Sequence, residues 1–328
     1  MIMTPATTRI SAFGGLLLGA LVLPVGAFAQ EKFPSKPIEF ILPAPPGGGL
    51  DRSSRLLADA AEPILGQKII FNHKPGGGGS IGTILISQAR PDGYTIGAIW
   101  HSPLTTLPHT QTVPYTVDSF KPVIQYSAGH YVMCVAPGFP AATGVEFINE
   151  LKANPSKYVY GHDGVGNAVQ LATERTLRAL GVQIRGVPFN GSIETARAFL
   201  GGHIGIYSGS VPPISAHVSA GKAKCLLVHS AESNPMLPDA TNLTELGIGD
   251  RETMLWHGVI APKDVDDAKI AIIANALREA AKSPRYQEFI RQNGETTPLR
   301  TGAEFGSVIV SESKAMLELA NSLGVGKK

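Results

Sequence analysis

The sequence lacks the patterns that mark metal sites and nucleic-acid binding. Only two of its 328 residues are cysteines, and no CxxC pair or other metal-ligand spacing occurs. Charged residues make up 16% of the chain and the net charge is +2, with no basic run. We therefore expect no metal and no nucleic-acid partner. Hydrophobic residues make up 43%, which is enough for a folded protein with real cores.

The motifs of common catalytic sites are also missing. There is no GxSxG nucleophile elbow, no HExxH pair among the nine histidines, and Asp163 is a solitary acid at its corner of the chain. Gly77, Gly79 and Gly82 match GxGxxG, but no acidic residue follows about 20 positions later. Thr83 stands where a Walker A loop requires lysine. The sequence predicts no catalytic residue and no nucleotide cofactor.

A long apolar run occurs only near the N-terminus. Residues 10–25 are apolar, follow a short segment that contains Arg9, and lead to Ala27 and Ala29 in the small-residue spacing of a signal-peptidase site. We expect residues 1–29 to be a signal peptide that is cleaved after Ala29. A membrane anchor is the alternative, although the run is shorter than the roughly 20 residues of a membrane span.

The two cysteines lie in separate apolar, strand-like runs. Cys134 is in YVMCVAP and Cys225 is in AKCLLVHS. We expect two separately buried thiols, because cysteine is often simply buried. A disulfide is the alternative, because an exported chain enters an oxidising compartment.

Strand-like and helix-like segments alternate along the rest of the chain. Residues 37–44, 68–73 and the segment after the turn at 90–93 read as strands, with helices at 52–65 and 81–89 between them. The pattern restarts near residue 130, and helices are expected at 267–282, 284–293 and 303–323. This order predicts the α/β class, with a mostly parallel sheet in each of two lobes and a cleft between them.

Two glycine-rich loops each lie between a strand and a helix. They are PAPPGGGLD, which starts at Pro43, and KPGGGGSIG, which starts at Lys74. N–H groups in the first turn of a helix lack helical partners and favour anions, and glycine lets a ligand approach the backbone. Corners on adjacent strands of one sheet face the same crevice. The loops therefore predict an anion site, with Asp51 as the N-cap of the first helix.

Other strand ends place small polar groups at the same predicted edge. Asn167 follows the glycines of YGHDGVGN, Asn190 ends GVPFN, and Ser208 lies in YSGS. His101 follows the third strand, and strand alternation directs either His101 or its neighbours Trp100 and Ser102 into the cleft.

The order and spacing of six segments resemble one family. The segments are FPSKPIEFILPAPPGGGLD, PGGGGSIGT, RPDGYTIG, GVPFNG, AGKAKCLLV and WHGVIAP. They resemble the periplasmic solute-binding receptors of tripartite tricarboxylate transporters, the Bug-type receptors, over essentially the whole mature chain. The resemblance implies a two-lobed Venus-flytrap fold, with lobe 1 from residues 30–128 and 255–328 and lobe 2 from residues 129–254.

The resemblance also implies a function and partners. It implies a non-enzymatic periplasmic receptor for a small organic carboxylate, with no cofactor, that works with a large and a small membrane subunit. The ligand carboxylate would contact loop N–H groups, and the second lobe would close over it. The expected ligand contacts are Pro46, Gly47, Gly48, Gly49, Gly77, Gly78, Gly79, Ser80, Ile81, His101, Ser102, Gly166, Asn167, Asn190 and Ser208.

Three positions depart from the pattern of that family. Ala44 replaces an aromatic residue, Asn167 a threonine, and Gly209 an aspartate. These changes predict a roomier, less acidic pocket and a ligand bulkier than a C4 dicarboxylate that lacks an amine, such as an aromatic or longer-chain carboxylate. Two other functions stay open: a secreted α/β hydrolase or isomerase, which would use His101 and Ser102, and a ligand-sensing partner of a signalling protein.

Overall fold

The computed structural model describes residues 1–3 and 32–327. The predicted signal peptide and its cleavage site after Ala29 lie outside the described residues, apart from the first three. In the described part of the chain, no helix has both the length and the apolar character that crossing a membrane requires. The fold below concerns the unit that starts at Phe33.

The first lobe is built on three parallel strands. They are ordered β2 (Ile69–His73), β1 (Ile38–Leu42) and β3 (Thr95–Trp100), and β9 (Met254–Pro262) joins β3 in the antiparallel sense. Helices α1 (Gly49–Leu65) and α2 (Ser80–Gln88) connect the parallel strands, and α9 (Asp267–Ala280) and α10 (Pro284–Gln292) follow β9. Phe40 of β1, Leu57 of α1 and Ile273 of α9 are fully buried in one core. Apolar residues that recur on one face of each helix explain this packing.

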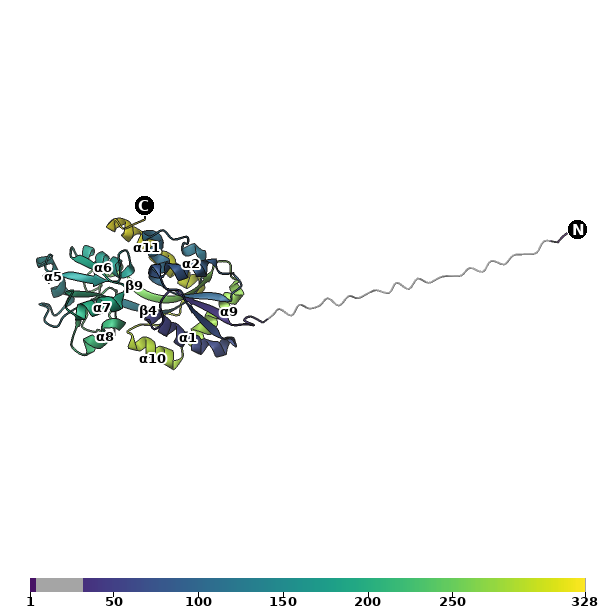
Figure 1. Ribbon diagram of the computed structural model, residues 1–328, viewed down its shortest axis with the longest axis horizontal. Helices are drawn as coiled ribbons and strands as arrows, with labels where there is room; N and C mark the ends of the chain where they lie inside the picture. Colours follow the sequence, from purple (N-terminus) through teal and green to yellow (C-terminus); the bar gives the residue numbers. More distant parts are fainter. Residues whose placement is uncertain (4–31, 328) are drawn as a thin grey trace. The chain divides into compact units, whose positions relative to one another are not determined.

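The second lobe repeats this plan with other strands. Its parallel strands are β7 (Ile206–Ser210), β5 (Val159–His162) and β6 (Arg185–Pro188), and β8 (Lys224–Val228) lies beyond β4 (Phe120–Val135). Its helices are α5 (Gly144–Ala153), α6 (Ala168–Ala179), α7 (Ser192–Leu200) and α8 (Pro212–Ser219). Figure 1 shows these helices gathered around the second lobe, with β4 and β9 between them and the helices of the first lobe.

Strand β4 joins the two lobes. Its first part pairs with β9 as far as His130, opposite Met254, and its last part pairs with β7 from Tyr131, opposite Ser210. The predicted parallel strands occur in both lobes, but β4, β8 and β9, which the prediction did not distinguish, all pair in the antiparallel sense. The chain enters the second lobe along β4 and returns along β9, without the crossover connection that parallel pairing needs.

The remaining helices lie where the lobes meet. Short helices α3 (His101–Thr105) and α4 (Leu107–Thr110) follow β3 directly, and α11 (Gly302–Leu323) packs on both of them and on α6. Leu171 of α6 contacts Met316 and Leu319 of α11, so the last helix touches both lobes. Single 3₁₀ turns occur at η1 (Gly77–Gly79), η2 (Val117–Ser119) and η3 (Gly249–Arg251).

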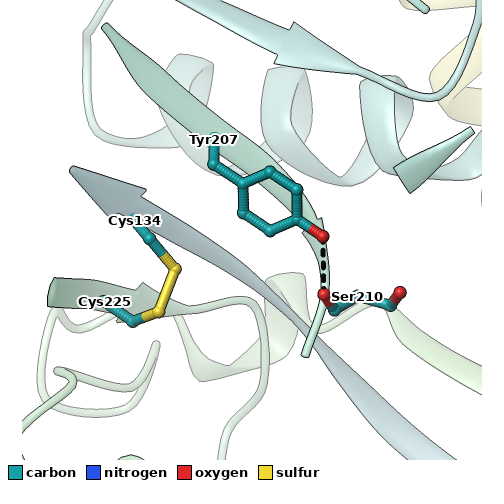
Figure 2. Close-up of a disulfide and its surroundings, with 4 residues drawn as sticks. All are labelled: Cys134, Tyr207, Ser210 and Cys225. Atoms are coloured by element: carbon teal, nitrogen blue, oxygen red, sulfur yellow. Dashed lines mark hydrogen bonds between the residues drawn. A yellow bond between two sulfur atoms is a disulfide. The ribbon is translucent and has the colours of Figure 1, made fainter. Parts of the chain in front are cut away.

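The two cysteines form a disulfide, which corrects the expectation of separate thiols. Cys134 and Cys225 are directly opposite each other on the adjacent antiparallel strands β4 and β8 (Figure 2). The expectation failed because pairing depends on the register of two strands whose cysteines are 91 residues apart in sequence. The bond ties the edge strand of the second lobe to the strand that joins the lobes.

Removing this disulfide should destabilise the protein. The bond closes a loop of 91 residues, and such cross-links typically contribute about 2–4 kcal/mol by restricting the unfolded chain. We expect a double variant, Cys134→Ala with Cys225→Ala, to unfold at a clearly lower urea concentration. Maleimide labelling of the denatured, unreduced wild type should find no free thiol, and two labelled thiols would contradict the assignment.

Candidate functional site

The two glycine-rich loops end at helix starts that have no side-chain cap. Gly48 is the N-cap of α1 and Gly79 is the N-cap of α2, and neither helix start has a capping hydrogen bond from the side chain of its N-cap residue. Within residues 32–327, the N–H groups of Gly48, Gly49, Gly77 and Gly78 donate to no backbone or side-chain acceptor. Three of these four glycines are exposed, so the loops present free donors next to positive helix ends.

The second loop fits closely against the first loop and against α3. A Cβ atom on Gly79 would lie 2.6 Å from Pro103 Cγ and 2.6 Å from the Trp100 ring. A Cβ atom on Gly82 would lie 2.8 Å from Pro43 Cα, where the first loop begins. Gly79 also has a φ of +99°, which L-residues with a side chain rarely adopt. Glycine at 79 and 82 thus holds the two loops together over the start of α3.

Asp51 supports the first loop in a way that the sequence did not reveal. It occupies the third position of α1, not the N-cap, so that expectation is wrong. Its Oδ2 accepts the Gly47 N–H at 2.9 Å, and its Oδ1 lies 2.7 Å from His73 Nε2 and 3.0 Å from Arg55 Nε. Burial alone would raise the pKa of Asp51, but these partners outweigh it and lower the pKa below its usual value. The Gly47 N–H is therefore already occupied.

Replacing Asp51 should weaken the fold in a pH-dependent way. We expect Asp51→Asn to lose about 2 kcal/mol at pH 7, because hydrogen bonds to a charged group contribute about 1.5–3 kcal/mol. Because the pKa of Asp51 is lower in the folded than in the unfolded protein, its ionised carboxylate stabilises the fold above the unfolded pKa of about 3.8. This stabilisation is lost as the pH falls through the folded pKa. Urea unfolding should separate variant and wild type at pH 7 and bring them together as the pH falls from about 3.8 through the folded pKa. An equal gap at both pH values would contradict this role.

Two helices of the second lobe use the same support. Gln170, at the third position of α6, accepts the Gly166 N–H at 2.7 Å. Glu194, at the third position of α7, accepts the Asn190 N–H at 3.3 Å. The predicted contacts Gly166 and Asn190 therefore do not offer free backbone donors. In α2 the third position is Gly82, which has no side chain to occupy the loop before it.

His101 is buried between the two lobes. It is the first residue of α3 and not part of the strand. The expectation that strand alternation directs either His101 or its neighbours into the cleft therefore does not apply. Its Nε2 is hydrogen-bonded to the Tyr131 hydroxyl, and its ring packs edge-on against Trp256. Burial lowers the pKa of His101 to about 3, so the imidazole is neutral. His101 Nδ1 and Ser102 Oγ are buried without a hydrogen-bond partner among the described residues.

Asn167 and Gly166 bring the second lobe against the first. A Cβ atom on Gly78 would lie 4.0 Å from Asn167 Oδ1, and a Cβ atom on Gly166 would lie 3.4 Å from Thr110 Cβ. Asn167 is the N-cap of α6, but its Nδ2 donates to the Asp163 carbonyl at 3.0 Å and its side chain caps no N–H. The second glycine loop and the start of α6 thus face each other across the lobes.

Ser208 and Gly209 lie inside the second lobe. Ser208 is fully buried and its Oγ lies 2.7 Å from Thr173 Oγ1, so it faces α6. The Tyr207 hydroxyl donates to the Ser210 carbonyl at 2.6 Å (Figure 2). A Cβ atom on Gly209 would overlap this hydroxyl. Because the Tyr207 hydroxyl occupies the space of a side chain at 209, Gly209 does not make the pocket roomier, which corrects that expectation.

We call the residues around these facing loops the interlobe site. The sequence analysis predicted its glycine loops, His101, Ser102 and Asn167 as ligand contacts, but it did not name Tyr131 or assign a role to Asp163. Asp163 could have been found from its place inside the YGHDGVGN loop. Tyr131 could not, because only the fold brings it to His101. The members of the site are Gly48, Gly49, Gly77, Gly78, His101, Ser102, Tyr131, Asp163 and Asn167.

A separate cavity lies beside the strands that join the lobes. It has a volume of about 680 Å³ and is lined by Arg175 of α6, Arg300, Trp256 and Glu312 among others. Trp256 Nε1 donates to Glu312, whose pKa burial raises to about 8. None of the predicted contact residues lines this cavity. Its two guanidinium groups make it a competing site for an anion, although Glu232 and Glu252 line the same cavity.

Comparison with known proteins places this chain in one family. Residues 53–321 match the model of the tripartite tricarboxylate transporter family receptor. A Cupriavidus necator protein, described as the UPF0065 protein of the gbd 5′ region, is 31% identical over 314 residues, which are 94% of each chain. The solved periplasmic binding protein BugD is 25% identical, with a TM-score of 0.78 over 90% of this chain and all of that one. A Rhodopseudomonas palustris protein solved with adipate is similar in fold alone, at 22% identity and a TM-score of 0.79 over 89% of this chain and 98% of that one.

Proposed function

Because this chain belongs to the tripartite tricarboxylate transporter receptor family, we propose that it captures a small organic carboxylate at the interlobe site. Receptors of this family are periplasmic solute-binding proteins, and the structures like this chain are periplasmic binding proteins. The protein would act after export, once its signal peptide is cleaved after Ala29. It would deliver its ligand to a large and a small membrane subunit and would not catalyse a reaction.

The free N–H groups at two uncapped helix starts are the observation that carries this proposal. Gly48 and Gly49 at α1, with Gly77 and Gly78 before α2, offer donors to a carboxylate in a region of positive helix-end potential. The loops are held in contact by Gly79 and Gly82, so little order has to be gained on binding. A site of this kind binds a carboxylate through backbone N–H groups and needs no arginine or lysine side chain.

His101 completes the proposed site with a directed donor. Among the described residues, the Tyr131 hydroxyl is hydrogen-bonded to His101 Nε2 alone, and burial raises the pKa of Tyr131 so that the phenol stays un-ionised. When the hydroxyl donates to Nε2, the single proton of the neutral imidazole is on Nδ1. The His101 Nδ1–H and the Ser102 hydroxyl are then buried donors without an acceptor, and a ligand oxygen would supply one.

We propose an aromatic or longer-chain carboxylate without an amine as the ligand. Support comes from Ala44, which is small where an aromatic residue would narrow the first loop, and from adipate in a protein of the same fold. The second lobe, with Asn167 already opposite Gly78, would cover the bound acid and exclude water from it. The ligand would thereby be held by both lobes.

A thermal-shift screen of the mature protein, from Gln30, tests the proposed function. The panel contains mono-, di-, tri- and aromatic carboxylates, with amino acids as controls. A ligand that binds only the folded state raises the melting temperature. We expect a clear shift with one class of carboxylate. No shift with any acid, in protein shown to be free of co-purified ligand, would contradict the proposal, and a largest shift with aspartate or glutamate would contradict the amine-free ligand.

A further inference from the structure

Asp163 is a buried acid in the loop that faces the first lobe. It follows β5 directly and precedes the α6 start, and its carbonyl is held by Asn167 Nδ2 at 3.0 Å. Although the residue is partly exposed, its carboxylate atom Oδ1 is buried and has no hydrogen-bond partner among the described residues. A buried polar atom without a partner is rare and requires an explanation. The atom belongs to the loop whose Asn167 side chain approaches Gly78 of the first lobe.

The neighbours of Asp163 link it to both lobes. On one side Asn167 approaches Gly78 of the first lobe. On the other side Tyr131 and Tyr207 both feel the Asp163 charge, which raises their pKa values further after burial has raised them. Tyr131 is in turn hydrogen-bonded to His101. Asp163 is therefore close to Asn167 and Tyr131, the two residues of the second lobe that approach Gly78 and His101 of the first.

The charge environment of Asp163 favours its neutral form. Burial raises the pKa of Asp163 to about 7, although backbone N–H groups, those of Val169 and Gln170 included, oppose this. No arginine or lysine is among the groups that shift it. The titratable groups on the packed elements are un-ionised near neutral pH. Burial lowers the pKa values of His101 of α3 and His162 of β5. It raises the pKa values of Tyr131 of β4 and Tyr207 of β7.

We propose that Asp163 is a specificity-determining residue that binds the ligand in its protonated form. Its O–H donates to an acceptor oxygen of the bound carboxylate, so that binding takes up a proton when the free carboxyl group is ionised. This inference rests on the proposed function. A like charge close to an ionised Asp163 would repel the ligand, whereas the acid form supplies the donor that a second oxygen requires. A ligand with an ammonium group would instead need the ionised form.

Calorimetry in pairs of buffers that differ in ionisation enthalpy tests this inference. The probes are adipate, pimelate, benzoate and phenylacetate, each titrated into the mature protein between pH 5.5 and 8.5. We expect close to one proton taken up per ligand at pH 8.5 and almost none at pH 5.5. Affinity should fall about tenfold per pH unit above the free pKa, since each unit removes nine-tenths of the competent form.

Two variants assign the proton. Asp163→Asn keeps the donor but cannot ionise, so its affinity should not change with pH and its proton uptake should vanish. Glu295→Gln is the matched control, because burial also raises the pKa of Glu295 to about 7, while this residue packs against Gly129 of β4 outside the interlobe site. Its proton uptake should equal that of the wild type.

The possible results separate this inference from the proposed function. Wild-type binding without proton uptake at pH 8.5, or uptake that Glu295→Gln abolishes and Asp163→Asn retains, would overturn the role of Asp163 alone. Binding of none of the probes to the wild type or to Asp163→Asn at any pH would overturn the carboxylate site and the inference with it.

Discussion

Replacing His101 by alanine should weaken carboxylate binding by about 10- to 100-fold. The substitution removes a buried, neutral imidazole whose Nδ1 has no partner and whose Nε2 is held by Tyr131. Losing one hydrogen bond to a charged group costs about 1.5–3 kcal/mol, which corresponds to this change in affinity. Isothermal titration with the carboxylate that gives the largest thermal shift measures the effect.

Two further variants separate a lost donor from a disturbed fold. Tyr131→Phe keeps the packing but frees the imidazole to carry its proton on either nitrogen, so it should weaken binding by a smaller factor than His101→Ala. His203→Ala changes an exposed histidine of the second lobe and should bind like the wild type. Wild-type affinity in His101→Ala would show that the carboxylate does not contact this histidine.

Replacing Gly79 by alanine should reduce affinity by roughly 100-fold and lower the melting temperature. An alanine at a φ of +99° costs about 1–2 kcal/mol, and its Cβ would lie 2.6 Å from both Pro103 and the Trp100 ring. Overpacking at such a rigid contact typically costs about 1–3 kcal/mol more. The loop can relieve this strain only by moving. Moving the loop displaces the N–H groups of Gly77 and Gly78 from the ligand.

A glycine elsewhere provides the control for backbone strain. Gly181 has a φ of +69°, but a Cβ atom there would meet no atom within 4 Å. Gly181→Ala should therefore lose about 1 kcal/mol of stability and bind the ligand normally. If Gly79→Ala retains wild-type affinity while it loses stability, the second loop does not hold the carboxylate.

Local signals in the sequence predicted most of the helices. The predicted helix at 52–65 is α1 without its first three residues, and the predicted helices at 267–282 and 284–293 match α9 and α10 to within two residues. Glycine and proline mark these boundaries, as where Gly66 ends α1 in the left-handed conformation. Such signals depend on a few neighbouring residues, so they can be recognised in the sequence without knowledge of the fold.

Other features depend on contacts between distant residues. The sequence HSPLTTLPHT has two prolines within ten residues, and it did not predict α3 and α4, whose buried side chains pack against α11. The sequence could not tell that the chain returns along β9, and hence that this strand runs antiparallel to β3 and β4. The register that pairs Cys134 with Cys225 likewise belongs to the tertiary fold.

The same division applies to the interlobe site. The glycine loops were predicted because strand, glycine and helix follow one another in the sequence. That Gly47, Gly166 and Asn190 donate their N–H groups internally was not predicted, because it depends on how Asp51, Gln170 and Glu194 turn back towards their loops. The Tyr131–His101 hydrogen bond joins residues 30 positions apart that only the meeting of the lobes brings together.

A crystal structure of the mature protein with the carboxylate that gives the largest thermal shift tests the central claim most directly. We predict carboxylate oxygens within hydrogen-bond distance of the N–H groups of Gly48 or Gly49 and of Gly77 or Gly78, with His101 Nδ1 facing the ligand. A carboxylate bound instead to Arg175 and Arg300, in the cavity beside the strands that join the lobes, would contradict capture by the glycine loops.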